Sequence, residues 1–485
     1  MASTHAEHQV IIVGGGVTGL TLALMLQHLK VNYVLLEAYG TVTPNAGASI
    51  GLYANGLRVL DQLGLYEEVL FKGQTVEKRA TRDGETGTRH STRRTNPLLI
   101  ERHGYATLFM GRFELLSILY SHISEKQRII VNKKAVQIEN LEHAALVHTM
   151  DGSVFKGQAV VGADGVHSTV RREMWRIAEA KEPEVIPAQD KQNISCEHAC
   201  VFGTARTQSE GPLSIEPGEL IASSAPGTVA ACMGGPEGKI FVFWFWALPQ
   251  SQRSCRIENI PRFTEVEKQR QLALAANTIM TDSGVRLSQI TNDFETSGVT
   301  ALPNFVLQRW HYGRIIVIGD AAHKFNPLVG QGGNSCIESC ASLVNSLQKS
   351  LGNHLSENAT WDGGALIQAF RAVENQRIDR VFDMVERCQV AMRAAAWESW
   401  HARLMQKFVM PLLPLSTITD FYSSFITPGL RLEGFKDPTK THKWLYDDEK
   451  LEKPNSSFFA RPSMAKAIFA VVVALTSIKA YHGYN

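Results

Sequence analysis

The stretch Gly14-Gly15-Gly16-Val17-Thr18-Gly19 joins a short β-branched run, residues 10–13, to residues 18–30, which carry apolar side chains at helical spacing. These neighbours predict a buried parallel strand followed by a helix. In the turn between them, Gly14 permits a tight bend, Gly16 lets the backbone approach a pyrophosphate, and Gly19 allows the helix to pack closely on the strand. The first N–H groups of the helix would face the phosphates. The stretch therefore predicts a dinucleotide-binding unit.

An acidic residue supports this interpretation. A second strand is expected at residues 33–36, and it ends at Glu37, 18 residues after Gly19. A carboxylate at this position can accept hydrogen bonds from a ribose diol and disfavours a 2′-phosphate. We therefore expect the bound dinucleotide to be FAD or NAD rather than NADP.

Two later stretches repeat the pattern of a strand that runs into a glycine-containing loop. They are GADGVHSTVR at 162–171 and GDAAHKFNPLVGQGGN at 319–334. Asp320 follows a strand, where open α/β sheets bind ligands, and could bond the ribityl chain of a flavin. The glycines around Gly333 open a helix whose positive end would stabilise negative charge on the flavin pyrimidine edge. Asp320 alone could be an N-cap and the glycines alone a loop, but their joint occurrence favours FAD.

Composition and charge exclude other classes of protein. The 485 residues include 49 basic and 47 acidic side chains, a net charge of +2 that leaves no electrostatic footprint for nucleic acid. The seven cysteines are odd in number and scattered, and none has the paired spacing of a zinc site. We expect reduced thiols, no structural metal and no nucleic-acid partner.

The order of the motifs predicts an α/β fold with a discontinuous first lobe. Residues 9–75, 105–185 and 300–350 would form a Rossmann-like FAD/NAD(P)-binding lobe. Residues 186–299 are rich in β-branched and aromatic side chains, which indicates a second, mainly antiparallel β lobe for the substrate. Residues 76–104 are assigned to the same lobe. Residues 351–460 are expected to be helical.

The C-terminus carries a hydrophobic tail. Ala467–Ile478 is an uninterrupted uncharged run that would span about 18 Å as a helix, short of the ~30 Å core of a bilayer. Residues 464–484 reach the required length if Lys466 and Lys479 snorkel to the two interfaces. We expect a membrane anchor that leaves the catalytic domain in the cytoplasm; a docked terminal helix is the alternative.

From Val10 to about Arg380, these motifs resemble the single-component (group A) flavoprotein monooxygenases of the aromatic-hydroxylase fold. The resemblance implies bound FAD, NAD(P)H as co-substrate and O2. It also implies that Asp164 touches FAD and the nicotinamide nucleotide, and that Arg112 heads a helix against the flavin. Gly51 would run beside the flavin, with Asp320 and Gly333 as ribityl- and pyrimidine-side contacts. No catalytic acid or base is implied at a position that can be named.

A narrower resemblance is to the fungal epoxidases of meroterpenoid and indole-diterpene pathways. It implies epoxidation of a prenyl double bond in a lipophilic, prenylated small molecule. Residues 186–300 contain no tyrosine, which favours an alkene over a phenol that needs deprotonation, although His198 and Arg206 remain candidate bases. The alternatives are an aromatic-ring hydroxylase of the salicylate-hydroxylase type and a flavin dehydrogenase or reductase that does not oxygenate.

Several conspicuous side chains have an ordinary structural interpretation. Trp244 and Trp246 share one face of a predicted strand, as core residues do. His323 is expected to bond backbone or cofactor phosphate rather than act as a base. The arginines of the helical region are expected to be solvated charges; they are Arg371, Arg377 and Arg380.

Overall fold

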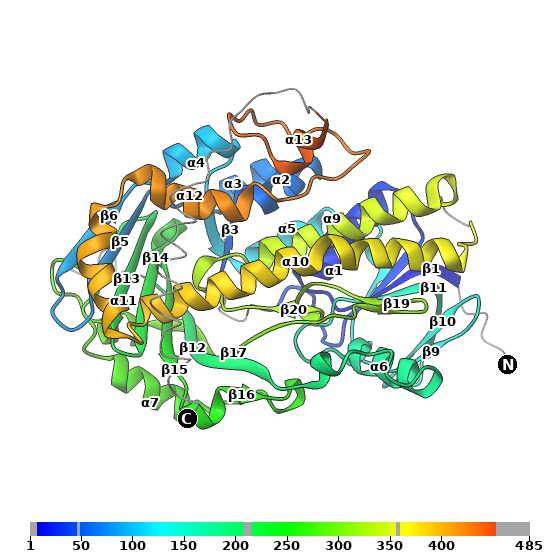
Figure 1. The fold of residues 1–485 in the computed structure, drawn as a ribbon, viewed down its shortest axis with the longest axis horizontal. Coiled ribbons are helices and arrows are strands. Elements are labelled where there is room, and N and C mark those ends of the chain that lie inside the picture. The colour runs from blue at the N-terminus through cyan, green and yellow to red at the C-terminus, as the bar shows by residue number, and fades with distance from the viewer. Residues whose placement is uncertain (1–6, 46–48, 207–214, 356–358, 453–485) are drawn as a thin grey trace.

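The structure, a computed structural model, describes residues 7–45, 49–206, 215–355 and 359–452 (Figure 1). Two large sheets lie toward opposite ends of the molecule, and the long helix α10 (Gly363–Ala395) spans the distance between them. This is the α/β architecture that the motif order predicted, with a nucleotide-binding type of sheet and a second, mostly antiparallel sheet.

The first sheet has a parallel centre. β1 (Glu7–Val13) lies between β2 (Tyr33–Leu36) and β11 (Val154–Gly162), and β11 pairs in parallel with β19 (Ile315–Val317). These strands are runs of buried β-branched and aliphatic residues, as expected of strands covered on both faces. The sheet is completed by β8 (Ile129–Ile130), β9 (Ala135–Asn140), β10 (Ala145–Thr149) and β18 (His311–Tyr312).

Helices flank this sheet and the small sheet beside it. α1 (Val17–His28) follows the glycine stretch, and α9 (Gly332–Leu351) packs along it. The small sheet comprises β3 (Ser49–Leu52), β4 (Gln74–Thr75) and β7 (Leu108–Gly111). The other helices of this part are α2 (Ala54–Gln62), α3 (Tyr66–Lys72), α4 (Asn96–His103), α5 (Arg112–Ser121) and α6 (Thr169–Lys181).

The second sheet pairs its strands antiparallel except where β13 (Glu219–Ala225) meets β5 (Lys78–Asp83). Trp244 and Trp246 of β15 (Lys239–Ala247) are buried on one face, which confirms their interpretation as core residues. The remaining elements of this part are β6 (Arg89–Arg93), β12 (Ile194–Arg206), β14 (Thr228–Gly234), β16 (Ser254–Cys255), β17 (Phe294–Val306), β20 (His323–Lys324), α7 (Glu265–Ala275) and α8 (Leu287–Thr291).

Two arginines of α10 correct the expectation of solvated charges. Arg377 is fully buried, and its guanidinium forms an ion pair with Glu338 of α9, whose side chain is also fully buried. Arg380 is 12% exposed and contacts the other carboxylate oxygen at 2.6 Å. Because α9 and α10 pack side by side, the charges on the shared face are buried and must compensate one another. Arg371 is exposed, as predicted.

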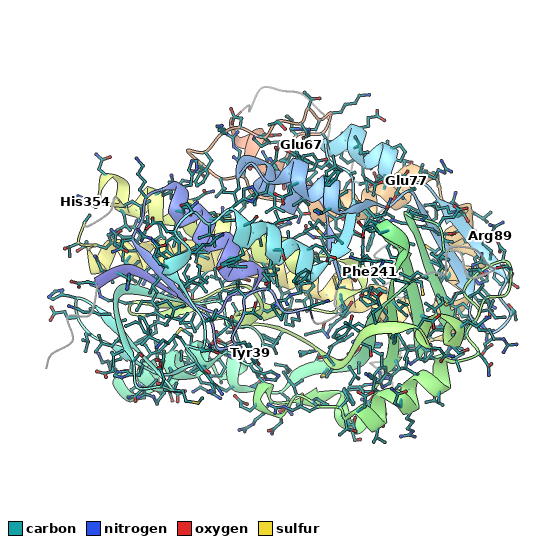
Figure 2. The ribbon with its side chains drawn as sticks, turned by 180° about the vertical axis from the view of Figure 1, so that it is seen from behind. Tyr39, Glu67, Glu77, Arg89, Phe241 and His354 are labelled. Atoms are coloured by element: carbon teal, nitrogen blue, oxygen red, sulfur yellow. The ribbon has the colours of Figure 1, made fainter. Side chains whose placement is uncertain are left out.

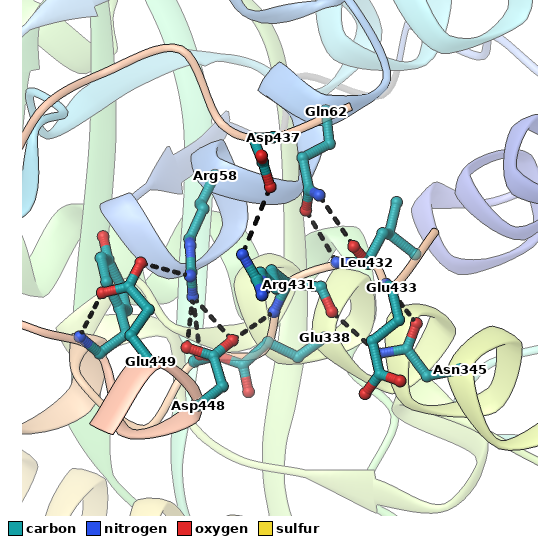
Figure 3. A network of polar contacts seen from close by, with 12 residues as sticks. Arg58, Gln62, Glu338, Asn345, Arg431, Leu432, Glu433, Asp437, Asp448 and Glu449 are labelled. Atoms are coloured by element: carbon teal, nitrogen blue, oxygen red, sulfur yellow. Dashed lines mark hydrogen bonds and ion pairs between the residues drawn. The ribbon is translucent and has the colours of Figure 1, made fainter. Parts of the chain in front are cut away.

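The chain after α10 first packs beside β6 of the second sheet and then returns to α4 and α2. It forms α11 (Trp400–Leu404), α12 (Leu415–Ile426) and α13 (Asp447–Glu452). In Figure 3, the buried Arg58 of α2 reaches Asp448 at 3.0 Å and Glu449 at 2.8 Å, so the last described helix is held against α2. The hydrophobic tail at 464–484 lies outside the described residues. Within the described ranges, no helix has both the length and the apolar character needed to cross a bilayer.

Candidate functional site

The glycine stretch has the geometry expected of a phosphate-binding turn. Gly14 has φ +106°, and a Cβ there would lie 2.5 Å from the Ala163 carbonyl oxygen. A Cβ on Gly19 would lie 1.9 Å from the Gly14 carbonyl oxygen. A Cβ on Gly16 would lie 3.4 Å from the Arg112 guanidinium. The backbone is therefore packed against its neighbours on one side and lies close to a cation on the other, an arrangement suited to a pyrophosphate.

Glu37 is positioned by the same turn. Its carboxylate accepts hydrogen bonds from the amides of Gly15 at 2.7 Å and Tyr39 at 2.9 Å. Only 9% of the residue is exposed, so this acid is fixed at the end of β2. A carboxylate oxygen has two lone pairs, so both oxygens can still accept from a ribose hydroxyl.

These groups line a cavity of about 960 Å³. This volume is near the upper end of the ~300–1,000 Å³ common for cofactor pockets. The described wall includes two carboxylates, those of Glu37 and Asp164, beside a larger number of cationic side chains. Tyr39, labelled in Figure 2, also belongs to the wall. The cationic side chains are Arg112, Lys133, Lys134, Arg172 and Arg262. The glycine backbone, the fixed acid and the excess of cations together fit an adenine dinucleotide with its charged pyrophosphate.

Asp164 lines the cavity, but its carboxylate is engaged within the protein. It accepts from the Ser168 hydroxyl at 2.5 Å and from the amides of Thr169 at 2.7 Å and Val170 at 3.1 Å. Ser168 is the N-cap of α6, and Asp164 supports it by accepting from the first two amides of the helix. The cap fixes the loop 164–168 at the cavity wall.

The second and third motifs are joined by a buried arginine. Arg171 donates to the Ala321 carbonyl at 2.8 Å and to the Val166 carbonyl at 2.7 Å. Burial lowers the pKa of its guanidinium to about 10. Gly319, with φ +61°, places the third motif against α1, since a Cβ there would lie 2.4 Å from the Thr18 hydroxyl oxygen. Motifs that lie hundreds of residues apart therefore meet at one place.

The remaining predicted residues lie beside the large cavity rather than in its described wall. Asp320 is about one-third exposed and forms an ion pair with Lys324. Gly333 abuts β3, since a Cβ there would lie 2.3 Å from Cδ1 of Ile50. A Cβ on Gly51 would lie 3.3 Å from the Phe109 ring. The flavin-side segments predicted from the sequence, around residues 51 and 333, are therefore neighbours.

Sequence reasoning missed Asn334. Its amide is fully buried, accepts from the Tyr53 amide at 2.9 Å, and donates to the carbonyls of Gly51 at 3.0 Å and Gly330 at 2.9 Å. Asn334 thus ties β3 to the glycine loop before α9. The available signal was a polar amide placed directly after the glycines, at the start of a predicted helix.

A second, smaller cavity of about 360 Å³ adjoins the first. The two share His167, Ile260 and Thr300 in their walls. The rest of the small cavity is mostly apolar, and its further described lining residues are Ser49, Val166, Cys200, Phe202, Phe243, Ala301, Leu302, Pro303, Lys324 and Pro327. Sequence reasoning did not name Phe202 or Phe243. The signal for Phe243 was its alternation with Trp244 and Trp246, which places it on the opposite face of β15.

The ionisable groups of the small cavity have defined charges near neutral pH. Burial opposes the charge on Lys324, but the Asp320 carboxylate outweighs it and raises the pKa of the lysine. Partial burial, assisted by Arg262 and Arg171, lowers the pKa of His167. Burial raises the pKa of the Cys200 thiol. The cavity therefore holds one cation, one neutral imidazole and one neutral thiol.

The histidines considered from the sequence lie elsewhere. His323 is buried, with Nε2 at 3.1 Å from the Ser339 hydroxyl, and lines neither cavity. His198 pairs with Glu398, and Arg206 pairs with Glu295 on the surface. Neither candidate base lies in the described wall of the small cavity.

Comparison with known proteins agrees with this geometry. The sequence profile of the family described as "FAD binding domain" matches residues 7–359. The chain belongs to this family. The match spans the glycine stretch, both later motifs and both large sheets, so it covers every element that lines the two cavities.

Relatives of this FAD-binding protein include fungal enzymes of similar length. It is 33% identical over 445 residues to the FAD-dependent monooxygenase nvfK of Aspergillus novofumigatus, covering 90% of each chain. It is 34% identical over 381 residues to the FAD-dependent monooxygenase penE of Penicillium thymicola, covering 78% of this chain and 77% of the relative.

A solved structure shares the fold. Klebsiella pneumoniae HpxO, complexed with FAD and uric acid, superposes with a TM-score of 0.69 at 20% identity. The superposition covers 86% of this chain and 96% of HpxO. The predicted family, the monooxygenase class and the FAD cofactor are confirmed, and the alternative of a non-oxygenating reductase is set aside. Bound FAD, reduced by NAD(P)H, supplies the electrons that activate O2.

Proposed function

We propose that this FAD-dependent monooxygenase epoxidises a prenyl double bond of a lipophilic terpenoid or meroterpenoid intermediate in fungal secondary metabolism. The observation that carries the proposal is the apolar wall of the small cavity beside the nucleotide site. The aromatic rings of Phe202 and Phe243 and the aliphatic side chains around them suit an isoprenoid chain.

The ionisable groups of this cavity fit the same reaction. An alkene reacts as the electron-rich partner and needs positioning and exclusion of water rather than a strong base. No Asp, Glu or Tyr occurs among the described lining residues of the small cavity. Lys324 is held as a cation by Asp320, so it cannot accept a proton.

The test is a product analysis with isotopically heavy dioxygen. Membranes from cells that express the chain receive NADPH and a panel of prenylated aromatics, simple phenols and benzoates. One heavy oxygen in the isoprenoid fragment supports epoxidation. A heavy oxygen on the aromatic ring overturns it, and so does oxygenation of the phenols alone.

Ring hydroxylation is the second candidate, because His167 offers a neutral imidazole where the two cavities meet. A phenol could lose its proton to this group. His167→Gln separates the candidates. Epoxidation is expected to keep its dependence on pH, whereas a hydroxylation that uses this base loses the rising limb of its pH profile.

We also propose that residues 464–484 anchor the protein to a membrane with the catalytic part in the cytoplasm. The support is the uncharged run 467–478 and the lysines that flank it. Deletion of residues 461–485 is expected to move the protein from the membrane pellet to the supernatant. Equal partition of the full and shortened chains would contradict the anchor.

A further inference from the structure

The segment that follows α10 turns a row of large apolar side chains outward. It consists of α11, a π-helical turn (Met405–Val409) and a 3-10 turn (Met410–Leu412). The exposed fractions are 60% for Trp400, 44% for Leu404, 63% for Phe408 and 82% for Leu412. These four side chains recur every four residues and all are exposed, and Val409 and Met410 beside them are 39% and 38% exposed. We call the four side chains the outer stripe.

The cationic side chains of the same segment, Arg403 and Lys407, make contacts with the rest of the protein, although the Arg403 side chain is 40% exposed. Lys407 donates to the carboxylate of Asp83 at 2.5 Å, and Asp83 is buried. The Lys407 ammonium lies 4.9 Å from the ring centre of Trp397, and the Arg403 guanidinium lies 5.0 Å from the same centre. Arg93 of β6 donates to the Pro411 carbonyl. These contacts fix which face of the segment points outward.

This arrangement reverses the usual amphipathic pattern. A surface helix of a water-soluble protein turns its apolar stripe toward the core and its charges toward water. Here the cationic side chains bind the segment to the protein through Asp83 and Trp397, and the side chains of the outer stripe are exposed to solvent. Contiguous exposed apolar side chains mark sites of interaction with an apolar partner.

We propose that the outer stripe inserts into the interface of a lipid bilayer. Trp, Phe and Leu on one face are the side chains of helices that lie in the headgroup region of membranes. The edge strand β6 lies beside the segment, at the left end of Figure 1, and carries Arg89 and Arg93, with Arg94 next in sequence. Arg89 pairs with Asp282 at 2.9 Å and Arg93 donates to the Pro411 carbonyl, whereas Arg94 is exposed. The positive charge that Arg93 and Arg94 add at this edge complements anionic headgroups.

A second copy of the chain fits the stripe less well. A symmetric dimer through the stripe would bring two arginine-bearing β6 edges to one interface, where like charges repel. Anionic headgroups would neutralise the same charges. The stripe, at residues 400–412, is separate in sequence from residues 464–484, so variants can test the stripe and the proposed anchor one at a time.

Tryptophan fluorescence tests the proposal with the full chain. Trp400 is the most exposed tryptophan, Trp444 is 39% exposed, and the other tryptophans of the described residues are buried. Residues 453–485 contain no tryptophan, so that segment adds nothing to the signal. The protein is mixed with vesicles of phosphatidylcholine and phosphatidylserine whose acyl chains carry bromine, a contact quencher. We expect quenching that is mostly lost in Trp400→Phe and retained in Trp444→Phe.

Charged variants provide the second arm. The double variant Leu404→Asp with Phe408→Asp is expected to lower quenching of Trp400 at least about threefold while FAD content stays normal. Phe71→Asp, at an 82% exposed position of α3, is the matched control and should quench like wild type. Equal quenching in wild type and Trp400→Phe overturns the proposal. A dimer that the double variant dissolves, with no quenching by vesicles, overturns it in favour of a second copy.

Discussion

The two adjoining cavities are built in different ways. The large one has walls of glycine backbone, an acid fixed by two amide groups, and several cations, and these features are determined over short stretches such as 14–19. The small one is formed by side chains from β12, β15 and the end of β17. The comparison shows that a nucleotide site depends on backbone that only glycine permits, whereas the substrate cavity depends on which faces of distant strands meet. FAD binding in the large cavity should therefore be lost when a side-chain atom is added to a packed glycine. Substrate affinity in the small cavity should change gradually with side-chain size.

The largest effect is expected where the large cavity depends on bare backbone. Gly19→Ala would place a Cβ 1.9 Å from the Gly14 carbonyl oxygen, so α1 and the phosphate turn must separate. We expect protein with essentially no bound FAD, measured by flavin absorbance after purification. Gly152→Asn is the control, since Gly152 is exposed, lines neither cavity and has no atom within 4 Å of its Cβ position, and Asn tolerates its φ of +84°. Equal flavin loss in both variants would show that the loss does not come from the close contact at Gly19.

The next largest effect is expected on the free energy of unfolding, at the buried cluster of Glu338, Arg377 and Arg380. Glu338→Gln would leave the buried Arg377 and the nearly buried Arg380 without their shared countercharge. Removing one partner of a buried ion pair costs about 3–5 kcal/mol, because an uncompensated charge remains. Urea unfolding measures this loss. Glu386→Gln, at an exposed position on α10, should leave the free energy of unfolding unchanged; a similar loss there would argue against a specific role for the cluster.

The third effect depends on pH. Burial lowers the pKa of His323 to about 3 from 6.5, so the folded state keeps this ring neutral. Below pH 6.5 the unfolded chain binds the proton first, and stability is lost as the pH falls toward 3. Between pH 6.5 and about pH 5 this amounts to about 1.5 kcal/mol. His323→Gln is expected to flatten the pH dependence of unfolding by that amount, whereas His143→Gln, at an 83% exposed side chain, should not.

The smallest effect is expected in the substrate cavity. Phe243→Ala removes an aromatic wall and should raise KM for a prenylated substrate about tenfold at unchanged FAD content. Trp246→Phe changes the opposite face of the same strand and should leave KM unaltered. If Phe243→Ala lowered FAD content instead, the assignment of the small cavity to the substrate and of the large cavity to FAD would be wrong.

The sequence predicted local features well and long-range pairings poorly. The strand 33–36, the turn 14–19 and the acid at Glu37 follow from short patterns, and the structure shows each of them. The burial of Arg377 depends on the packing of α9 against α10, which a helical pattern alone does not specify. Phe202 and Phe243 meet only because β12 and β15 pair across forty residues of chain. The lining of the small cavity could therefore not be predicted from the sequence of the individual strands.

A crystal structure of the enzyme loaded with FAD and a prenylated aromatic compound would show directly whether the large cavity holds the dinucleotide and the small cavity the isoprenoid chain. We expect a dinucleotide along the glycine turn, with a ribose at Glu37 and the flavin ring toward the small cavity. The isoprenoid chain should lie against Phe202 and Phe243. An aromatic ring in that place with its prenyl chain in solvent would contradict the proposed epoxidation. A flavin nucleotide outside the large cavity would contradict the assignment of that cavity to the dinucleotide.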